Sequence, residues 1–233
     1  MRNIAIIPAR SGSKSLPNKN IIELKGKPLM HYTIKAALDS GYFQEVMVST
    51  DSENYADIAR KCGANVPFLR SEKMSGDSVG SWDTVREVLS NYRQMGKTYD
   101  YVALLQPTSP LRDADDIKQV FKRLCETGSH NAVTVTEVDH PVQWCFRLSE
   151  TGLMDEMAVS PYNNMRRQDL ETYYRENGAV YVVDAKRIVD SDYNFYGDKC
   201  IGCIMQREKS IDIDTKIDLL IAELEMKSED LGD

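Results

Sequence analysis

The chain has 233 residues, enough for one sizeable α/β domain and too few for a second of similar size. Its 42% hydrophobic and 28% charged residues are ordinary for a globular protein, and its net charge of −7 argues against a nucleic-acid or acidic-membrane partner. No apolar run approaches the ~20 residues of a membrane span, and the chain enters a predicted strand without a signal peptide. We therefore expect a single domain over residues 1–233, located in the cytoplasm.

The first predicted element is a short apolar strand over residues 4–7, followed by a loop of small and basic residues. Arg10, Gly12, Lys14 and Lys19 all lie in this loop. Ligands of open α/β sheets bind beyond the carboxyl ends of the strands, so small side chains and cations there can hold a polyphosphate. Neither the Walker A pattern nor the dinucleotide glycine fingerprint occurs, and an ordinary solvated loop is the alternative.

Strand and helix patterns then alternate along the chain, which predicts a mostly parallel sheet with right-handed crossovers and flanking helices. Further strands are predicted over 45–50, 66–69, 101–105, 132–138, 178–183 and 201–205. Helices are predicted over 28–40, 52–62, 82–92, 113–128 and 185–189, with a last amphipathic helix through 217–224.

Residues 139–175 do not fit this alternation and contain no compact strand–helix–strand unit. An excursion of that length is expected to be functional, either as a lid over a site or as a dimerisation arm. It contains the basic pair Arg166 and Arg167, for which a solvated surface pair is the alternative.

The five cysteines are scattered and odd in number, which is typical of reduced thiols. Cys200 and Cys203 have C-x-x-C spacing, but no second pair and no nearby histidine accompanies them. Two thiols on one strand are therefore favoured over a zinc or redox site.

Two late aspartates, Asp212 and Asp214, are spaced i, i+2. On an extended chain both lie on one face, while Ile211 and Ile213 point toward the core. Mg²⁺ prefers few protein carboxylates and completes its shell with water and phosphate oxygens, so this pair is a candidate magnesium site. The alternative is that Asp214 and the next residue only cap the last helix.

Several separated segments together resemble the acylneuraminate cytidylyltransferases, the enzymes that make CMP-sialic acid and its relatives. The matching runs are Ile-Pro-Ala-Arg-Ser-Gly-Ser-Lys from Ile7, Leu-Leu-Gln-Pro-Thr-Ser-Pro-Leu-Arg from Leu104, Glu-Asn-Gly-Ala-Val-Tyr from Glu176 and Ser-Ile-Asp-Ile-Asp-Thr from Ser210. The polar segment 70–81 resembles the family's base-reading loop. One departure is Ser15, where the family usually has glycine.

The resemblance implies a Rossmann-like nucleotidyltransferase domain with a protruding dimerisation arm over 139–175. It implies transfer of CMP from CTP to the anomeric hydroxyl of a nine-carbon 2-keto sugar acid, with Mg²⁺ as cofactor and a homodimer as the assembly. Implied catalytic residues are Arg10, Lys14, Lys19, Arg167, Asp212 and Asp214, the two aspartates also binding metal. Implied nucleotide contacts are Ala9, Arg10, Ser11, Asn20, Arg70, Val79 and Ser81, and implied sugar contacts are Gln106, Arg167 and Asn177.

Other functions remain open from the sequence. The acceptor could be legionaminic, pseudaminic or eight-carbon Kdo acid rather than an N-acylneuraminate. A catalytically silent nucleotide-binding module would not need both late aspartates, and a nicotinamide oxidoreductase would need the missing glycine fingerprint.

Overall fold

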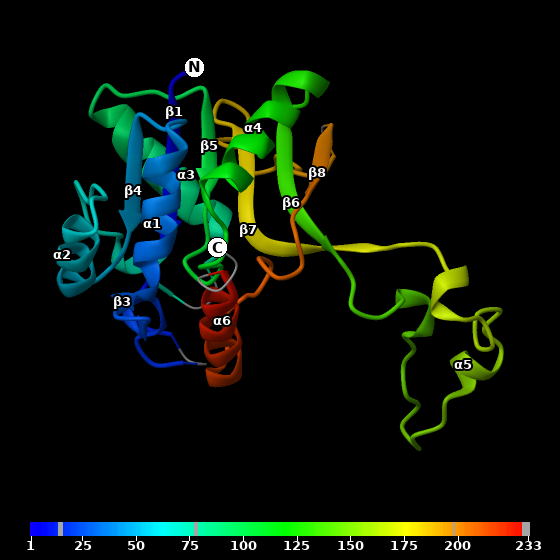
Figure 1. Cartoon of the computed structure of the whole chain (residues 1–233). Coiled ribbons are helices and arrows are strands. Elements are labelled where there is room, and N and C mark those ends of the chain that lie inside the picture. The colour runs from blue at the N-terminus through cyan, green and yellow to red at the C-terminus, as the bar shows by residue number, and fades with distance from the viewer. Residues whose placement is uncertain (14–15, 77–78, 198, 230–233) are drawn as a thin grey trace.

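A six-stranded sheet of order β4-β1-β5-β7-β6-β8 forms the centre of the computed structural model, which describes residues 1–13, 16–76, 79–197 and 199–229 (Figure 1). Its strands are β1 (Asn3–Pro8), β4 (Glu45–Ser49), β5 (Tyr101–Leu104), β6 (Asn131–Glu137), β7 (Tyr174–Asp184) and β8 (Cys200–Ile204). Only β7 runs antiparallel to its neighbours in this sheet, whereas the other pairs are parallel. The predicted mostly parallel α/β architecture is confirmed.

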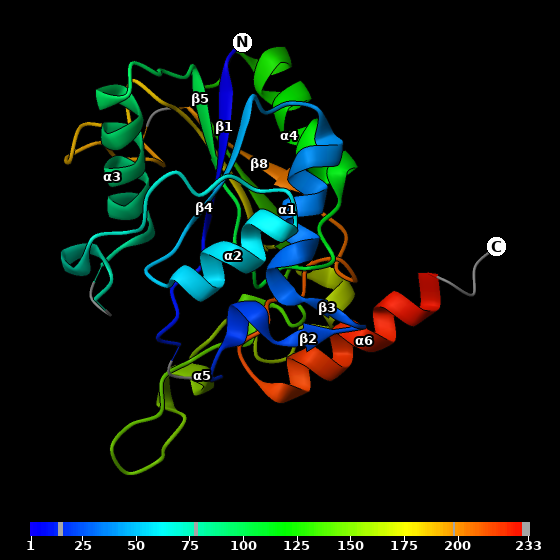
Figure 2. The ribbon, with the colours of Figure 1, turned by 90° about the vertical axis from the view of Figure 1, so that its left-hand side faces the viewer.

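Helices cover both faces of this sheet, α3 on one and α1, α2 and α4 on the other (Figure 2). The helices are α1 (Leu29–Ser40), α2 (Glu53–Lys61), α3 (Ser81–Gln94), α4 (Ala114–Thr127), α5 (Asp155–Ala158) and α6 (Lys216–Glu229), and a small hairpin joins β2 (Glu23–Leu24) to β3 (Lys27–Pro28). Local signals set the ends: the Ser52 hydroxyl caps α2, the Asp113 carboxylate caps α4, and Gly41 ends α1 at φ 70°. In the described part of the chain, no helix combines the length and apolarity needed to cross a bilayer.

Alternation along β1 explains its unbroken apolar sequence. Ala5 and Ile7 pack into the core cluster beneath α1, α2 and α4, while Ile4 and Ile6 pack into the cluster beneath α3. All four side chains are fully buried, because a central parallel strand has no solvent face. The same geometry separates Cys200 and Cys203 on β8, which pack into different clusters and are free thiols.

Two predicted elements are wrong. Residues 66–69 form no strand, since only Asn65 makes an isolated bridge to Met47 and Pro67 has no N–H to donate. Residues 185–189 form turns rather than a helix, although Ile188 N–H donates to the Asp184 carbonyl. A segment this short has little helical hydrogen bonding to offset the cost of nucleation.

Helix α6 has the predicted spacing of apolar residues, but the stripe that these residues form faces solvent. Ile217 and Leu224 are 68% and 62% exposed, while Ala222 on the other side is fully buried. The periodicity identified the stripe correctly and could not reveal whether this chain covers it.

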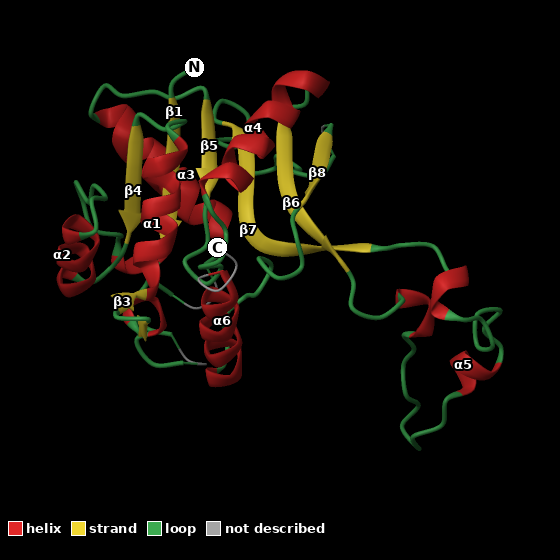
Figure 3. Cartoon of the chain, viewed as in Figure 1, coloured by secondary structure: helices red, strands yellow, loops and turns green. Residues whose placement is uncertain are grey.

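Residues 138–173 leave the sheet between β6 and β7 and extend away from the body (Figures 1 and 3). This segment, which we call the arm, is mostly loop with the single-turn helix α5. Large apolar side chains on the arm are exposed, including Leu148, Leu153, Val159 and Tyr162.

Candidate active site

The carboxyl ends of β1, β4 and β5 meet at one edge of the sheet because these strands are parallel neighbours. A cavity of about 420 Å³ opens there, and we call it the edge pocket. Eight predicted site residues line it: Arg10, Lys19, Asn20, Arg70, Val79, Ser81, Gln106 and Asp214. Segments from the start, middle and end of the sequence therefore share one pocket.

The basic loop and the late aspartates meet directly in this pocket. Lys19 Nζ lies 2.8 Å from Asp214 Oδ1, and the Asn20 side-chain amide donates to the Arg10 carbonyl at 3.0 Å. Asn20 is buried, so it fixes the shape of the loop that carries the cations. Lys14 lies outside the described residues.

Asp51, at the carboxyl end of β4, holds the other side of the basic loop. Its two carboxylate oxygens accept from the Ser11 N–H at 2.8 Å and the Ser11 hydroxyl at 3.1 Å. Ala9 is fully buried, and its N–H donates to the Ser49 carbonyl at 2.9 Å. The structure thus uses the polar groups of Ser11 and the N–H of Ala9 within the protein and does not bring these two residues into the pocket lining.

Arg70 is anchored against the end of β4. Its Nε donates to Ser49 Oγ at 3.1 Å and its Nη2 donates to the Ser49 carbonyl at 2.8 Å. Burial lowers the pKa of Arg70, and the nearby Asp51 and Glu87 carboxylates oppose that shift. The guanidinium is therefore a fixed positive group in the lining of the pocket that Lys19 and Arg10 also line.

Asp212 lies beside the Gln106 turn. A Cβ added at Gly178 would stand 3.7 Å from Gln106 Nε2 and 3.8 Å from Asp212 Oδ2, so both polar groups border the same glycine. The Ile213 N–H donates to the Thr108 carbonyl at 2.8 Å, which ties the aspartate segment to this turn. Ile213 is fully buried, as its place between the two aspartates predicted, whereas Ile211 is only half-buried.

Desolvation by surrounding protein atoms raises the pKa of Asp212, and the neighbouring Asp214 charge adds to the shift. The Thr108 hydroxyl and the Lys19 ammonium oppose it. Because burial disfavours the ionised form of Asp212, a nearby cation would stabilise that form.

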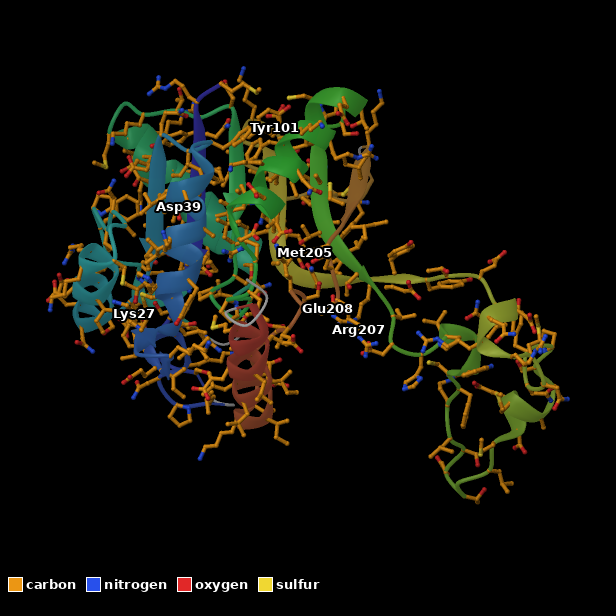
Figure 4. The ribbon with its side chains drawn as sticks, in the orientation of Figure 1. Lys27, Asp39, Tyr101, Met205, Arg207 and Glu208 are labelled. Carbon is orange, nitrogen blue, oxygen red and sulfur yellow. The ribbon has the colours of Figure 1, made fainter. Side chains whose placement is uncertain are left out.

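A second cavity of about 520 Å³ adjoins Asp212 on the side facing the arm. Arg175, Arg207 and Asp139 line it together with the first turns of α6, and Arg207 pairs with Asp139 at 2.6 Å. Arg207 and Glu208 lie on the side of the body that faces the arm (Figure 4). The two late aspartates thus line two adjoining cavities, Asp214 the edge pocket and Asp212 this one.

Two predicted site residues lie elsewhere in this chain. Asn177 is buried, with its amide donating to Ser210 Oγ at 2.9 Å and accepting from Thr134 Oγ1 at 2.6 Å, and it lines neither cavity. It ties β6 and β7 to the loop that precedes Asp212. Arg167 is exposed on the arm, which extends away from the body of the molecule (Figure 1), and it does not line the edge pocket.

Sequence reasoning missed three contributors to the site. Asp51 supports the basic loop, Thr108 contacts the aspartate segment through its carbonyl, and Gly178 occupies φ 78° between Gln106 and Asp212. A carboxylate directly after a strand was a usable signal for Asp51, since strand ends of parallel neighbours share an edge. The contact between Thr108 and Ile213 joins residues more than a hundred positions apart and has no local signal.

The donor set fits Mg²⁺ with a phosphate-bearing ligand. Two carboxylates, Asp212 and Asp214, are what this ion commonly takes from a protein in nucleotide sites, the substrate phosphates and waters supplying the rest. Among the described residues no group of three or more histidine, cysteine or acidic side chains is arranged to hold a metal on its own.

The chain matches the family model described as Cytidylyltransferase over residues 4–225. It is 36% identical over 224 residues to a pseudaminic acid cytidylyltransferase of Campylobacter jejuni and 39% identical over 230 residues to a CMP-N,N'-diacetyllegionaminic acid synthase of Legionella pneumophila. These alignments cover 96% of this chain and 96% and 95% of those proteins. An N-acylneuraminate cytidylyltransferase of Escherichia coli is 38% identical over 94% of this chain and 51% of its own length.

A solved structure has the same fold. It is a CMP:2-keto-3-deoxy-manno-octonic acid synthetase complexed with CTP, with a TM-score of 0.72 and 17% identity over 98% of this chain and 100% of that one. The family resemblance seen in the separated motifs is thus confirmed by nearly full-length alignments. The chain belongs to the cytidylyltransferase family and is a CTP-dependent nucleotidyltransferase.

Proposed function

We propose that this protein transfers CMP from CTP to the anomeric hydroxyl of a nine-carbon 2-keto sugar acid of the N-acylneuraminate type, releasing pyrophosphate. The observation that carries the proposal is the meeting of Lys19 and Asp214 at 2.8 Å in a pocket that Arg10, Arg70 and Gln106 also line. Three cations suit a triphosphate, and the half-buried Gln106 amide, which borders the same glycine as the Asp212 carboxylate, suits a polyhydroxylated acceptor.

In this reaction the sugar hydroxyl forms a bond to the α-phosphorus while the bond to the pyrophosphate oxygen breaks, and the hydroxyl proton passes to solvent or a carboxylate. Catalysis then depends on aligning nucleophile and leaving group and on stabilising charge at the transferring group. Lys19 and Arg10 hold the triphosphate side, and Gln106 orients the acceptor. Asp212 and Asp214 would hold Mg²⁺, which, when bound, neutralises charge on the phosphate oxygens.

The acceptor is tested by incubating the protein with CTP, Mg²⁺ and, separately, N-acetylneuraminic, legionaminic, pseudaminic and Kdo acids, with mass detection of the CMP-sugar. We expect one nine-carbon acid to be favoured in kcat/KM by roughly 10- to 200-fold over acids that differ by a small substituent. ATP in place of CTP is the control for base selection. Absence of both CMP-sugar and pyrophosphate with every acid would leave a nucleotide-binding module and refute the proposal.

We further propose that the active assembly is a homodimer in which the arm of each copy supplies Arg167 to the other copy's site. Two features support this: Arg167 is exposed on an arm that extends away from the body of its own chain, and the arm exposes Leu148, Leu153 and Val159. A closed two-fold assembly would cover both arms at once.

Mixing two inactive variants tests the shared site. Asp212→Asn keeps its arm and loses its own site, whereas Arg167→Ala keeps its site and loses the donated arginine. After exchange in a 1:1 mixture, half the dimers are mixed and each has one complete site, so about a quarter of wild-type activity returns. Activity no greater than that of the separate variants, with exchange verified by mass, would show that Arg167 is not donated between copies.

A further inference from the structure

Arg112, which the site described above does not use, is almost completely buried, with 1% of its surface exposed. It lies between the Gln106 turn and the start of α4. Its Nη2 donates to Thr33 Oγ1 at 2.8 Å and to the Gln106 carbonyl at 3.1 Å, and its Nε is 3.5 Å from the Ala179 carbonyl. One guanidinium thus reaches α1, the turn after β5, and β7.

Burying a charged arginine costs desolvation free energy, so filling space does not by itself explain Arg112. The hydrogen-bond partners found for its side chain among the described residues are neutral, and its Nη1 has none. Burial lowers the pKa of Arg112 to about 10, with Asp113 and Asp116 opposing the shift, so the side chain remains charged near neutral pH. Well-packed apolar side chains often replace buried ions without loss of stability, so a buried cation calls for another explanation.

Of the three residues that Arg112 contacts, Gln106 lines the edge pocket, and the other two, Thr33 and Ala179, lie behind that lining. The Gln106 carbonyl is fixed by Arg112 Nη2 and also by Thr33 Oγ1 at 3.2 Å, while the Gln106 side chain lines the pocket. Ala179 follows Gly178, the glycine that separates the Gln106 amide from Asp212. Fixing both carbonyls therefore fixes where that amide stands relative to the carboxylate.

We propose that Arg112 is a positioning residue that sets the direction of Gln106 from behind the pocket wall, and so determines binding of the sugar acid without touching it. The inference rests on the proposed function for the identity of the acceptor. The cation also contributes positive potential behind a pocket that receives anions, because a charge in a low-dielectric interior is weakly screened. The proposed triphosphate contacts Arg10, Lys19 and Arg70 are not among the hydrogen-bond partners found for Arg112, so CTP binding should depend little on this residue.

The test compares Arg112→Met, Arg112→Lys and the matched surface control Arg123→Met, in which the replaced arginine is exposed on α4. Arg112→Met should raise KM for the sugar acid ~10-fold, the equivalent of one charge-assisted hydrogen bond, with KM for CTP changing less than about 3-fold. Arg112→Lys keeps the charge but not the fork that spans two carbonyls, so it should recover part of the loss. Arg123→Met should match wild type in both constants.

Hydrogen–deuterium exchange of the 104–109 peptide supplies a readout that does not require turnover. We expect faster exchange there in Arg112→Met and unchanged exchange in β4, which the arginine does not contact. If Arg112→Met fails to fold, Thr33→Val replaces it: this variant removes the hydroxyl shared by Arg112 and the Gln106 carbonyl at nearly constant volume.

The proposal is overturned if a folded variant keeps the wild-type KM for the acid, or if both KM values rise alike without faster exchange at 104–109. Failure of the proposed function looks different. In that case the wild type itself turns over none of the acids, and exchange at 104–109 still decides whether Arg112 holds the Gln106 turn.

Discussion

The edge pocket and the arm differ in whether their side chains find partners within the chain. At the edge, polar groups find partners within the chain, as Ser11 does with Asp51 and Lys19 with Asp214. On the arm, Val159 is 83% and Leu148 64% exposed to solvent. One chain therefore accounts for the geometry of the nucleotide side, whereas the exposed apolar side chains of the arm are the surface that the proposed dimer would cover.

The largest effect that separates the two regions is expected from Asp212→Asn. The change keeps the shape of the side chain and removes the charge that would hold the metal, so pyrophosphate release from CTP and sugar acid should fall roughly 10²- to 10³-fold. Melting temperature and oligomeric state should stay near those of the wild type. Turnover within a few-fold of wild type would remove Asp212 from the proposed metal site.

The matched control for this variant is Asp155→Asn, which removes an exposed carboxylate from the first turn of α5 on the arm. Its charge change is identical, but we expect normal turnover. Equal losses in both variants would mean that net charge rather than position determines activity.

The next effect is expected from Lys19→Met, measured as kcat/KM for CTP. Removing the ammonium leaves Asp214 without the partner seen at 2.8 Å and takes one cation from the triphosphate wall. We expect a loss of roughly 10- to 100-fold, with Lys19→Arg retaining part of the activity because the charge is kept. A variant with an unchanged constant would assign Lys19 to folding of the loop alone.

Features of this fold that have a local sequence signal could be predicted, and features that depend on distant segments could not. The strands, helix caps and mostly parallel order follow from local signals such as Ser52, Asp113 and the apolar run of β1. The sharing of one pocket by Lys19 and Asp214 agrees with the family resemblance, which implied that both are catalytic residues.

Other features had no local signal. The burial of Asn177, the contact of Thr108 with Ile213 and the buried position of Arg112 depend on packing between distant segments. The stripe on α6 showed its period but not its exposure, because periodicity describes a face and leaves open what covers that face.

Whether the arm lies in the proposed dimer interface is tested with Val159→Asp, and Val189→Asp is the control. Val189 is also an exposed apolar residue, but it lies on the body. A charge at Val159 should shift the dimer toward monomer by light scattering and leave the unfolding free energy of the monomer within about 0.5 kcal/mol. Unchanged assembly in the Val159 variant, or equal dissociation in both, would exclude this part of the arm from the interface.

The smallest effects are expected in thiol labelling, which compares the two regions without mutation. Cys125 on α4 and Cys145 on the arm are both exposed in the single chain, whereas Cys203 is buried. Burial raises the pKa of Cys200 to about 11, so at pH 8 only about one molecule in a thousand has the thiolate at this position. The labelling rate of Cys200 should therefore increase as the pH approaches 11.

If the arm is covered in the proposed dimer, Cys145 should label a few-fold more slowly than Cys125 at micromolar protein, and dilution should restore its labelling rate. Dilution-independent rates for both thiols would place Cys145 outside any interface, since only a surface covered by association depends on concentration.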